Sequence, residues 1–227
     1  MTSRKQTEMV SLFKWHAFDV RSILPDAWES EILAVARGSA RARALRPPHL
    51  TTREEPSVKE LIIRGVSAAV VAEKLPWLVD LYNHEFLELA QSLYSEKVSV
   101  ARGAKHTVVL NVTHADGTRY ECHVDTNPIQ GLLYVTSHPE GTGGELVVAN
   151  NSAASSLQEI DADTTIIYPQ HGYLVFFDAR FYPHYIRELL RPGDIRVAAA
   201  MNYYVPSCPE ALRPPDLDDY LYGTALS

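Results

Sequence analysis

The second half of the sequence is a series of short stretches rich in β-branched and aromatic residues, separated by turn signals. The separators include Ala115-Asp116-Gly117 and Pro192-Gly193-Asp194, which are typical of tight turns between strands. The predicted strands cover residues 105–113, 118–124, 131–136, 145–149, 164–168, 173–178, 184–190 and 195–205. Short strands at this spacing favour two sheets that close on each other over a single parallel sheet.

Residues 1–97 carry helix signals instead. Asp26 with Glu29 three positions later predicts a helix start, and Gly38 is placed to end that helix. Arginines follow at helical spacing, and we interpret them as a solvated helix face, with attraction of an anionic substrate as the weaker alternative. These arginines are Arg37, Arg41, Arg43 and Arg46.

Two further helices are predicted before the strands begin. The pair Ser57 and Glu60 repeats the capping pattern ahead of residues 61–75, and Pro76 suits the first turn of a helix that extends to Leu93. We therefore expect an α+β fold with an N-terminal helical support region.

Proline-rich segments flank these regions. Residues 46–56 are expected to form a loop over the mouth of an active site. The tail, residues 206–227, is expected to serve as a lid or to contact a second subunit, which leaves a homodimer open. We predict one domain over residues 1–227, mainly helical over 1–97 and with its β core over 98–205.

The composition limits the kind of protein. A net charge of -7 argues against a nucleic-acid binder, which usually carries a basic surplus. No apolar run approaches the roughly 20 residues that span a bilayer. The N-terminus lacks the apolar core of a signal peptide, and two cysteines do not make a disulfide framework. We therefore expect a cytoplasmic protein without a membrane partner.

His123 and Asp125 stand two positions apart on one predicted strand, so their side chains leave the same face. His184 begins a later strand, and Arg196 follows it after a turn. Two histidines and a carboxylate can hold one Fe(II) from a single side and leave open coordination positions. The ordered set of these residues therefore predicts a catalytic metal site.

With these residues in place, the chain resembles the Fe(II)/2-oxoglutarate-dependent oxygenases, in particular the prolyl-hydroxylase-like branch. The resemblance covers residues 105–205 and is carried by the motifs THADGTRYECHVD, LLYVT, TGGELVV, PQHGYLVFF and GDIRVAAAMNYYV together with His184. It implies a double-stranded β-helix, also called a jelly roll, with iron between its two sheets.

The resemblance also implies roles for single residues. His123, Asp125 and His184 would bind Fe(II), and Arg196 would pair with the distal carboxylate of 2-oxoglutarate, the co-substrate used with dioxygen. Tyr134 and Thr113 would help to hold that carboxylate. The expected reaction hydroxylates an unactivated C–H bond and releases succinate and carbon dioxide.

The layout of the motifs is also similar to a smaller group that hydroxylates or halogenates free amino acids. Halogenases replace the metal-binding carboxylate by a small residue, whereas Asp125 is present in this sequence. This difference favours hydroxylation of a small amine-bearing metabolite such as a free amino acid.

Three further residues are candidates for contact with the substrate. Asn202 shares a strand face with Arg196 because the two are six positions apart. Thr126 directly follows the metal carboxylate, and His106 begins a strand of the barrel. By strict alternation we expect Tyr120 to face away from His123 and to pack in the core.

Other functions stay open from the sequence alone. The substrate could be a peptide or an amino acid tethered to a carrier protein. The fold could instead belong to a cupin-like metalloenzyme that does not use 2-oxoglutarate. It could also be a binding module without catalysis, whose histidines are ordinary core residues.

Overall fold

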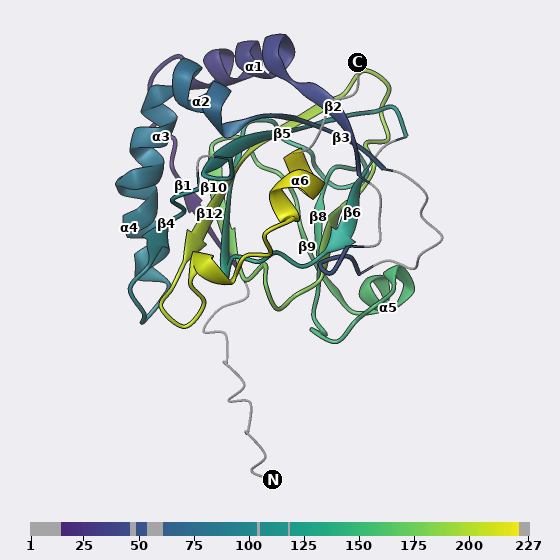
Figure 1. The fold of residues 1–227 in the computed structure, drawn as a ribbon. Helices are drawn as coiled ribbons and strands as arrows, with labels where there is room; N and C mark the ends of the chain where they lie inside the picture. The colour runs from purple at the N-terminus through teal and green to yellow at the C-terminus, as the bar shows by residue number, and fades with distance from the viewer. Residues whose placement is uncertain (1–14, 46–48, 54–60, 104, 118, 223–227) are drawn as a thin grey trace.

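The computed structural model describes residues 15–45, 49–53, 61–103, 105–117 and 119–222. Helices cover one side of two facing sheets (Figure 1). The strands are β1 Trp15–Asp19, β2 Arg41–Leu45, β3 Leu61–Val66, β4 Ser99–Val100, β5 Val108–His114, β6 Tyr120–His123, β7 Ile129–Tyr134, β8 Leu146–Ala149, β9 Thr164–Ile167, β10 Tyr173–Phe177, β11 His184–Ile186 and β12 Ile195–Tyr204. The helices are α1 Trp28–Ser39, α2 Ala68–Lys74, α3 Pro76–Asn83, α4 Glu85–Ser92, α5 Leu157–Ala162 and α6 Leu217–Tyr222, with a 3-10 turn at Glu210–Leu212.

The strand pairing is antiparallel throughout the described residues. The eight-stranded sheet has the order β1-β10-β7-β12-β5-β3-β2, with β4 beside β12, and the four-stranded sheet has the order β6-β11-β8-β9. The eight predicted strands are confirmed, with bounds that differ by a few residues. The two-sheet architecture expected from the sequence is therefore present.

Strand β12 shows how the sequence sorts side chains between the two faces of the large sheet. Val197, Ala199 and Met201 join the core under the helices, whereas Ala198 and Ala200 pack between the two sheets. This alternation is the period of a strand that is covered on both faces. It places the intervening polar positions of β12 in the space between the sheets.

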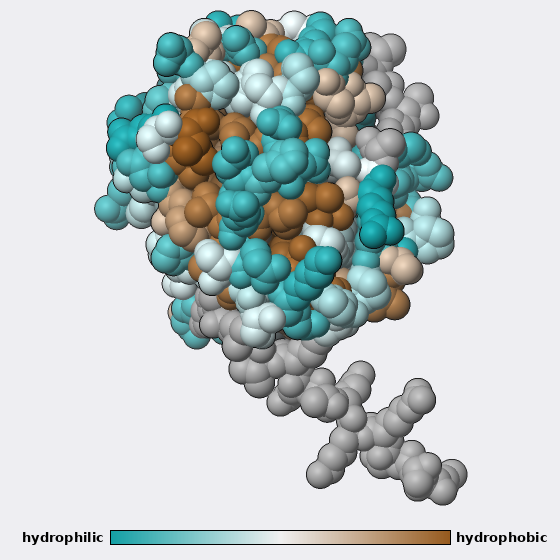
Figure 2. All heavy atoms as spheres, turned by 90° about the vertical axis from the view of Figure 1, so that its left-hand side faces the viewer, coloured by the Kyte–Doolittle hydropathy of each residue, from teal (hydrophilic) through white to brown (hydrophobic). Residues whose placement is uncertain are grey.

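The helices bury an apolar stripe against the outer face of the large sheet. Leu78, Tyr82 and Phe86 are almost fully buried in this layer. The Tyr82 hydroxyl donates to the carbonyl of Asn202 (2.7 Å), which ties α3 to β12. Figure 2 shows the helix-covered side of the molecule, where hydrophilic and hydrophobic side chains lie side by side. No described helix has the length and apolar character needed to cross a membrane.

Two predictions for the first 97 residues are wrong. Residues 61–66 form β3, not the start of a helix, because they pair with β2 and β5. Arg41 and Arg43 lie on β2, so the arginines do not share a helix face. Ser57, Glu60 and Arg46 lie outside the described residues.

The helix starts differ in detail from the sequence signals. Ala27, not Asp26, is the N-cap of α1, and it makes no side-chain cap. Gly38 lies inside the last turn of α1, which ends at Ser39. Pro76 occupies the first turn of α3, as predicted. The division into segments 1–97, 98–205 and 206–227 stays a prediction, since three strands of the first segment belong to the large sheet.

Candidate active site

His123, Asp125 and His184 come together at one end of the small sheet. His123 and His184 face each other across the β6–β11 ladder, and Asp125 follows two residues after His123. The His123 Nε2 atom lies 3.3 Å from one Asp125 carboxylate oxygen, and the His184 Nε2 atom lies 3.8 Å from the other. One potential ligand atom from each residue lies within 4.8 Å of the others, so the three could hold one metal ion.

Backbone carbonyls orient both imidazole rings. The Nδ1 atom of His123 lies 2.7 Å from the carbonyl oxygen of Glu121, and that of His184 lies 3.0 Å from the carbonyl oxygen of Tyr182. Because a carbonyl only accepts, each Nδ1 carries a hydrogen, and in the neutral form of each ring the Nε2 atom has the lone pair that can bind a metal. This second contact is what metal-binding histidines typically make.

The charges of the three groups also suit a cation. Burial raises the pKa of Asp125, but the hydrogen bond from His123 and the charges of His184 and His123 outweigh it, and the net pKa is lowered. Burial and the nearby His123 lower the pKa of His184 to about 4. Burial lowers the pKa of His123, yet the contact with Asp125 raises it overall. An ionised carboxylate beside a neutral imidazole fits a divalent transition metal.

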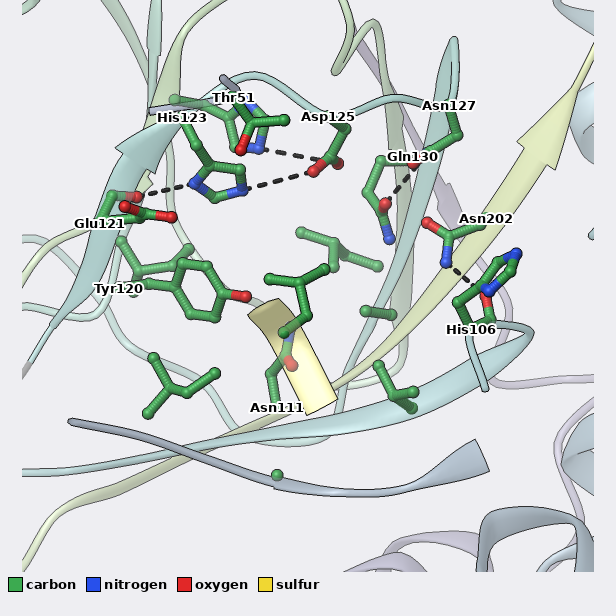
Figure 3. Close-up of a pocket in the computed structure, with 18 of the residues that line it drawn as sticks. Thr51, His106, Asn111, Tyr120, Glu121, His123, Asp125, Asn127, Gln130 and Asn202 are labelled. Carbon is green, nitrogen blue, oxygen red and sulfur yellow. Dashed lines mark hydrogen bonds and ion pairs between the residues drawn. The ribbon is translucent and has the colours of Figure 1, made fainter. Parts of the chain in front are cut away.

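The triad opens into a cavity of about 130 Å³ between the two sheets (Figure 3). One water needs only about 10–15 Å³, so the cavity can hold a larger molecule. Its wall combines residues of β2, β3, β5, β7 and β12 with residues of the small sheet and the C-terminal tail. Arg41 and Arg43 line it, which the predicted helix face would not have allowed.

Arg196 lies in the wall of the same cavity and is 1% exposed. Its Nε atom donates to the carbonyl of Gly144 (2.8 Å), while its buried Nη2 atom has no hydrogen-bond partner. Burial lowers the pKa of Arg196, an effect that the nearby Tyr134 opposes. The buried hydroxyl of Tyr134 also lacks a partner, and the guanidinium carbon lies 5.4 Å from the Tyr134 ring centre.

These unpartnered polar atoms test whether a dicarboxylate fits the site. A buried donor without a partner costs free energy, and a carboxylate could satisfy both the guanidinium and the hydroxyl. Thr113 lies opposite Arg196 in the β5–β12 ladder and lines the cavity, whereas Tyr134 stands behind the wall. The residues predicted to hold the co-substrate therefore lie around one buried charge.

The three predicted substrate residues also line the cavity. The amide of Asn202 donates to the carbonyl of His106. The His106 Nε2 atom lies 2.7 Å from a Glu210 carboxylate oxygen, so this ring is anchored to the tail. Thr126 borders the triad. Contact of Asn202, Thr126 and His106 with a substrate stays a prediction.

The prediction for Tyr120 is wrong. Its ring centre lies 5.0 Å from that of His123, and it lines the cavity. The register shifts within the β6–β11 pair, because His184 faces His123 while Ile186 faces Tyr120. Such an irregularity breaks strict alternation and turns both aromatic rings toward one side.

The sequence interpretation missed several residues of the wall. Glu121 lies two positions before His123, so the same strand alternation could have identified it. Gln130 and Asn111 lie on cavity-facing strands. Leu217 and Leu221 come from α6, and no sequence signal indicated which tail residues reach the cavity.

Two segments far apart in the sequence border the mouth of the cavity. The N–H of Val124 donates to the carbonyl of Thr51 (3.0 Å), and the N–H of Arg53 donates to the carbonyl of Cys122 (2.7 Å). This agrees with the predicted loop over the site for residues 49–53, while 46–48 and 54–56 lie outside the described residues. Helix α6 lies in front of the sheets (yellow in Figure 1) and lines the cavity with Leu217 and Leu221, while its role as a lid stays a prediction.

Comparison with known proteins shows what the chain is similar to. Residues 108–204 match the model of the 2OG-Fe(II) oxygenase superfamily. An oxidoreductase of the 2OG-Fe(II) oxygenase family from Burkholderia pseudomallei is 10% identical with a TM-score of 0.59, over 84% of this chain and 85% of that chain. No curated protein is significantly similar in sequence.

Two further solved structures differ in their reactions. The non-heme alpha ketoglutarate dependent epimerase SnoN from nogalamycin biosynthesis is 15% identical with a TM-score of 0.56, over 89% of this chain and 85% of that chain. A Pseudomonas putida prolyl-4-hydroxylase is 15% identical with a TM-score of 0.52, over 85% of this chain and 92% of that chain. Identities this low show a shared fold alone, and they confirm the double-stranded β-helix.

The family match covers the strands that carry His123, His184 and Arg196. A structure of SnoN contains Fe3+ and alpha ketoglutarate, which are the kinds of group that this cavity suits. Residues 108–204, which carry these side chains, are thus similar to the 2OG-Fe(II) oxygenase superfamily, a family of enzymes that use Fe(II), 2-oxoglutarate and dioxygen.

Proposed function

We propose that this enzyme hydroxylates an unactivated C–H bond of a small amine-bearing metabolite, in the first place a free amino acid. In the balanced reaction, the substrate, 2-oxoglutarate and dioxygen give the alcohol, succinate and carbon dioxide. The observation that carries the use of 2-oxoglutarate is the pair of unpartnered polar atoms on Arg196 and Tyr134, beside the cavity that contains the triad.

His123, Asp125 and His184 would hold Fe(II) through two Nε2 atoms and one carboxylate oxygen. Arg196 would anchor the distal carboxylate of 2-oxoglutarate, with help from the Tyr134 hydroxyl and from Thr113. The chemistry that the bound metal and co-substrate supply is oxidation of a C–H bond coupled to decarboxylation of 2-oxoglutarate.

The residues of this chain would contribute orientation and exclusion of water. The carbonyls of Glu121 and Tyr182 fix the two rings, so the Nε2 atoms point at Asp125 without rearrangement. Helix α6 and residues 49–53 border the cavity, where they would shield the reacting atoms from solvent. Polar side chains in the wall, including Asn111, Gln130 and Asn202, suit a polar metabolite.

The test is an anaerobic visible spectrum of the purified protein with Fe(II), before and after 2-oxoglutarate, beside the variant His123→Ala. A charge-transfer band that needs both additions and is absent from the variant would support the proposed metal and co-substrate sites. Bound iron without a band would contradict the role of 2-oxoglutarate at this site.

A substrate panel then tests the finer part of the proposal. Free amino acids, short peptides and carrier-tethered amino acids are compared by succinate release and product mass. Succinate release that is coupled to a mass gain of one oxygen with a free amino acid supports the proposal. Coupled turnover with tethered or peptide substrates alone contradicts it.

A further inference from the structure

Glu121 is a buried carboxylate that the proposed metal and co-substrate sites do not use. It is 1% exposed, lies on β6 two positions before His123 and therefore shares its face of the strand. Figure 3 shows its carboxylate beside the ring of His123 and above Tyr120 on the cavity wall. Apart from Asp125, it is the one carboxylate among the described residues that line this cavity.

The partners of Glu121 are neutral hydroxyl groups. The Tyr220 hydroxyl of α6 donates to one carboxylate oxygen (2.8 Å), and the Thr52 hydroxyl donates to the other (3.2 Å). Within the described part of the chain, no lysine, arginine or histidine forms an ion pair with Glu121. Buried charges in proteins are normally paired, because desolvation costs several kcal/mol per ion.

Three of the five arginines that line the cavity have other partners. Arg64 pairs with Asp116 (2.8 Å), Arg213 pairs with Asp218, and Arg43 donates to the carbonyl of Leu221 (3.4 Å). They do not neutralise Glu121. The cavity therefore has, next to the metal triad, a buried carboxyl group without an ion-pair partner, in addition to the buried guanidinium of Arg196.

From this arrangement we propose that Glu121 is the receptor for the ammonium group of the substrate. The inference rests on the proposed function and names the residue that selects the substrate class. An ammonium ion would supply the missing positive charge through charge-assisted hydrogen bonds. A carboxylate or a phosphate of a substrate would be repelled from this side of the cavity.

The position of Glu121 also bears on which carbon is oxidised. Residues two apart on a strand are about 7 Å apart, so an amine held at Glu121 lies a fixed, short distance from the metal site. This spacing favours a carbon several bonds away from the nitrogen. The Tyr220 hydroxyl positions the carboxylate, and its ring stacks on His49 with ring centres 4.4 Å apart.

The experiment measures preference for an ammonium ion, not activity. Straight-chain alkylamines and the common amino acids are titrated calorimetrically into the anaerobic protein with Fe(II) and 2-oxoglutarate, and each alkylamine is paired with the alcohol of equal length. We expect at least one amine to bind wild-type protein about 10- to 100-fold more tightly than its alcohol. The variant Glu121→Gln should lose this preference.

Matched variants separate the charge of Glu121 from its structural contacts. Glu140→Gln removes a carboxylate from the exposed surface and should keep the preference. Tyr220→Phe removes one hydroxyl donor but leaves the charge of Glu121, so the preference for the amine should remain. If Glu121→Gln does not fold, Glu121→Asp keeps the charge on a shorter side chain and should weaken the binding of the amine without abolishing the preference.

The inference is overturned if no amine binds better than its alcohol, or if Glu121→Gln retains the preference. Failure of the proposed function gives a different result. If the charge-transfer band is absent, the same titrations with metal-free protein still report whether an amine binds through Glu121. If the charge-transfer band forms normally but no amine binds better than its alcohol, the role of Glu121 is contradicted and the proposed metal and co-substrate sites are not.

Discussion

The guanidinium carbon of Arg196 lies 5.4 Å from the centre of the Tyr134 ring, and each of these residues has a buried polar atom without a hydrogen-bond partner. Both come from central strands of the large sheet, where Ala198 of β12 pairs with Tyr134 of β7. The sheet therefore holds a cation and a hydroxyl in a fixed relation before any ligand binds. Such preorganisation reduces the cost of binding an anion.

We predict that Arg196→Lys weakens the binding of 2-oxoglutarate by about 10- to 100-fold, because a point charge cannot reproduce a forked contact. Tyr134→Phe should weaken it less, since it removes one neutral donor. Titration of the anaerobic Fe(II) protein with 2-oxoglutarate measures both effects. Arg191→Lys, on the exposed turn before β12, is the matched control. Unchanged affinity in Arg196→Lys would refute the assignment.

A second prediction concerns the backbone that holds Arg196. Gly144 has a φ of 80°, and a Cβ there would lie 2.8 Å from a Leu189 methyl and 3.3 Å from Cδ of Arg196. Gly144→Ala should displace the arginine and weaken 2-oxoglutarate binding about tenfold or more. Gly141→Ala is the control, because Gly141 has a φ of 81° with nothing near its Cβ.

In both variants the new alanine must adopt a left-handed backbone conformation, which costs about 1–2 kcal/mol. Urea unfolding should therefore show destabilisation in both, and only Gly144→Ala should also lose co-substrate affinity. Equal affinity in the two variants would mean that the arginine does not depend on Gly144.

The strands that build the site could be predicted because their sequences alternate. On β12, Arg196 and Asn202 stand on the cavity face, while Val197, Ala199 and Met201 pack under the helices. This pattern depends on period alone. Alternation of this kind was sufficient to predict that the triad and Arg196 face the same cavity.

The features that the sequence did not reveal depend on tertiary pairing. Residues 61–66 contain good helix formers beside β-branched residues, so their sequence alone does not exclude a helix. Pairing with β5 stabilises the strand conformation. Tyr120 reaches the cavity through a register shift that local alternation cannot foresee. Tyr220 and Glu121 are 99 positions apart in the sequence, so no local pattern predicts their contact.

A third prediction tests the metal carboxylate. Asp125→Ala should abolish hydroxylation and lower iron affinity, because it removes one of three ligands and leaves a coordination position open to a halide. Iron content, succinate release and product mass, measured with and without chloride, check this outcome. Asp80→Ala, whose side chain is 72% exposed, serves as the control. Normal hydroxylation by Asp125→Ala would show that Asp125 is not a ligand.

The last prediction concerns how the tail is attached. Glu210 accepts hydrogen bonds from the N–H groups of Arg102 and Gly103 (2.8 and 2.9 Å) and lies 2.7 Å from Nε2 of His106. Partial burial raises the pKa of Glu210, but these donors outweigh burial and hold its pKa below the usual value. A carboxyl whose pKa is lowered by folding stabilises the protein above its unfolded pKa, and the contribution is lost as the pH falls through the folded pKa.

Glu210→Gln should therefore lower the free energy of unfolding by about 1 kcal/mol near neutral pH. The difference from wild type should shrink as the pH falls below about 4. Urea unfolding at a series of pH values measures it, with Glu140→Gln as the exposed control. A difference that stays constant with pH would mean that the variant loses packing and not charge. A difference that shrinks would show that the ionised carboxylate anchors the tail to the loop before β5, next to the cavity that the tail helps to line.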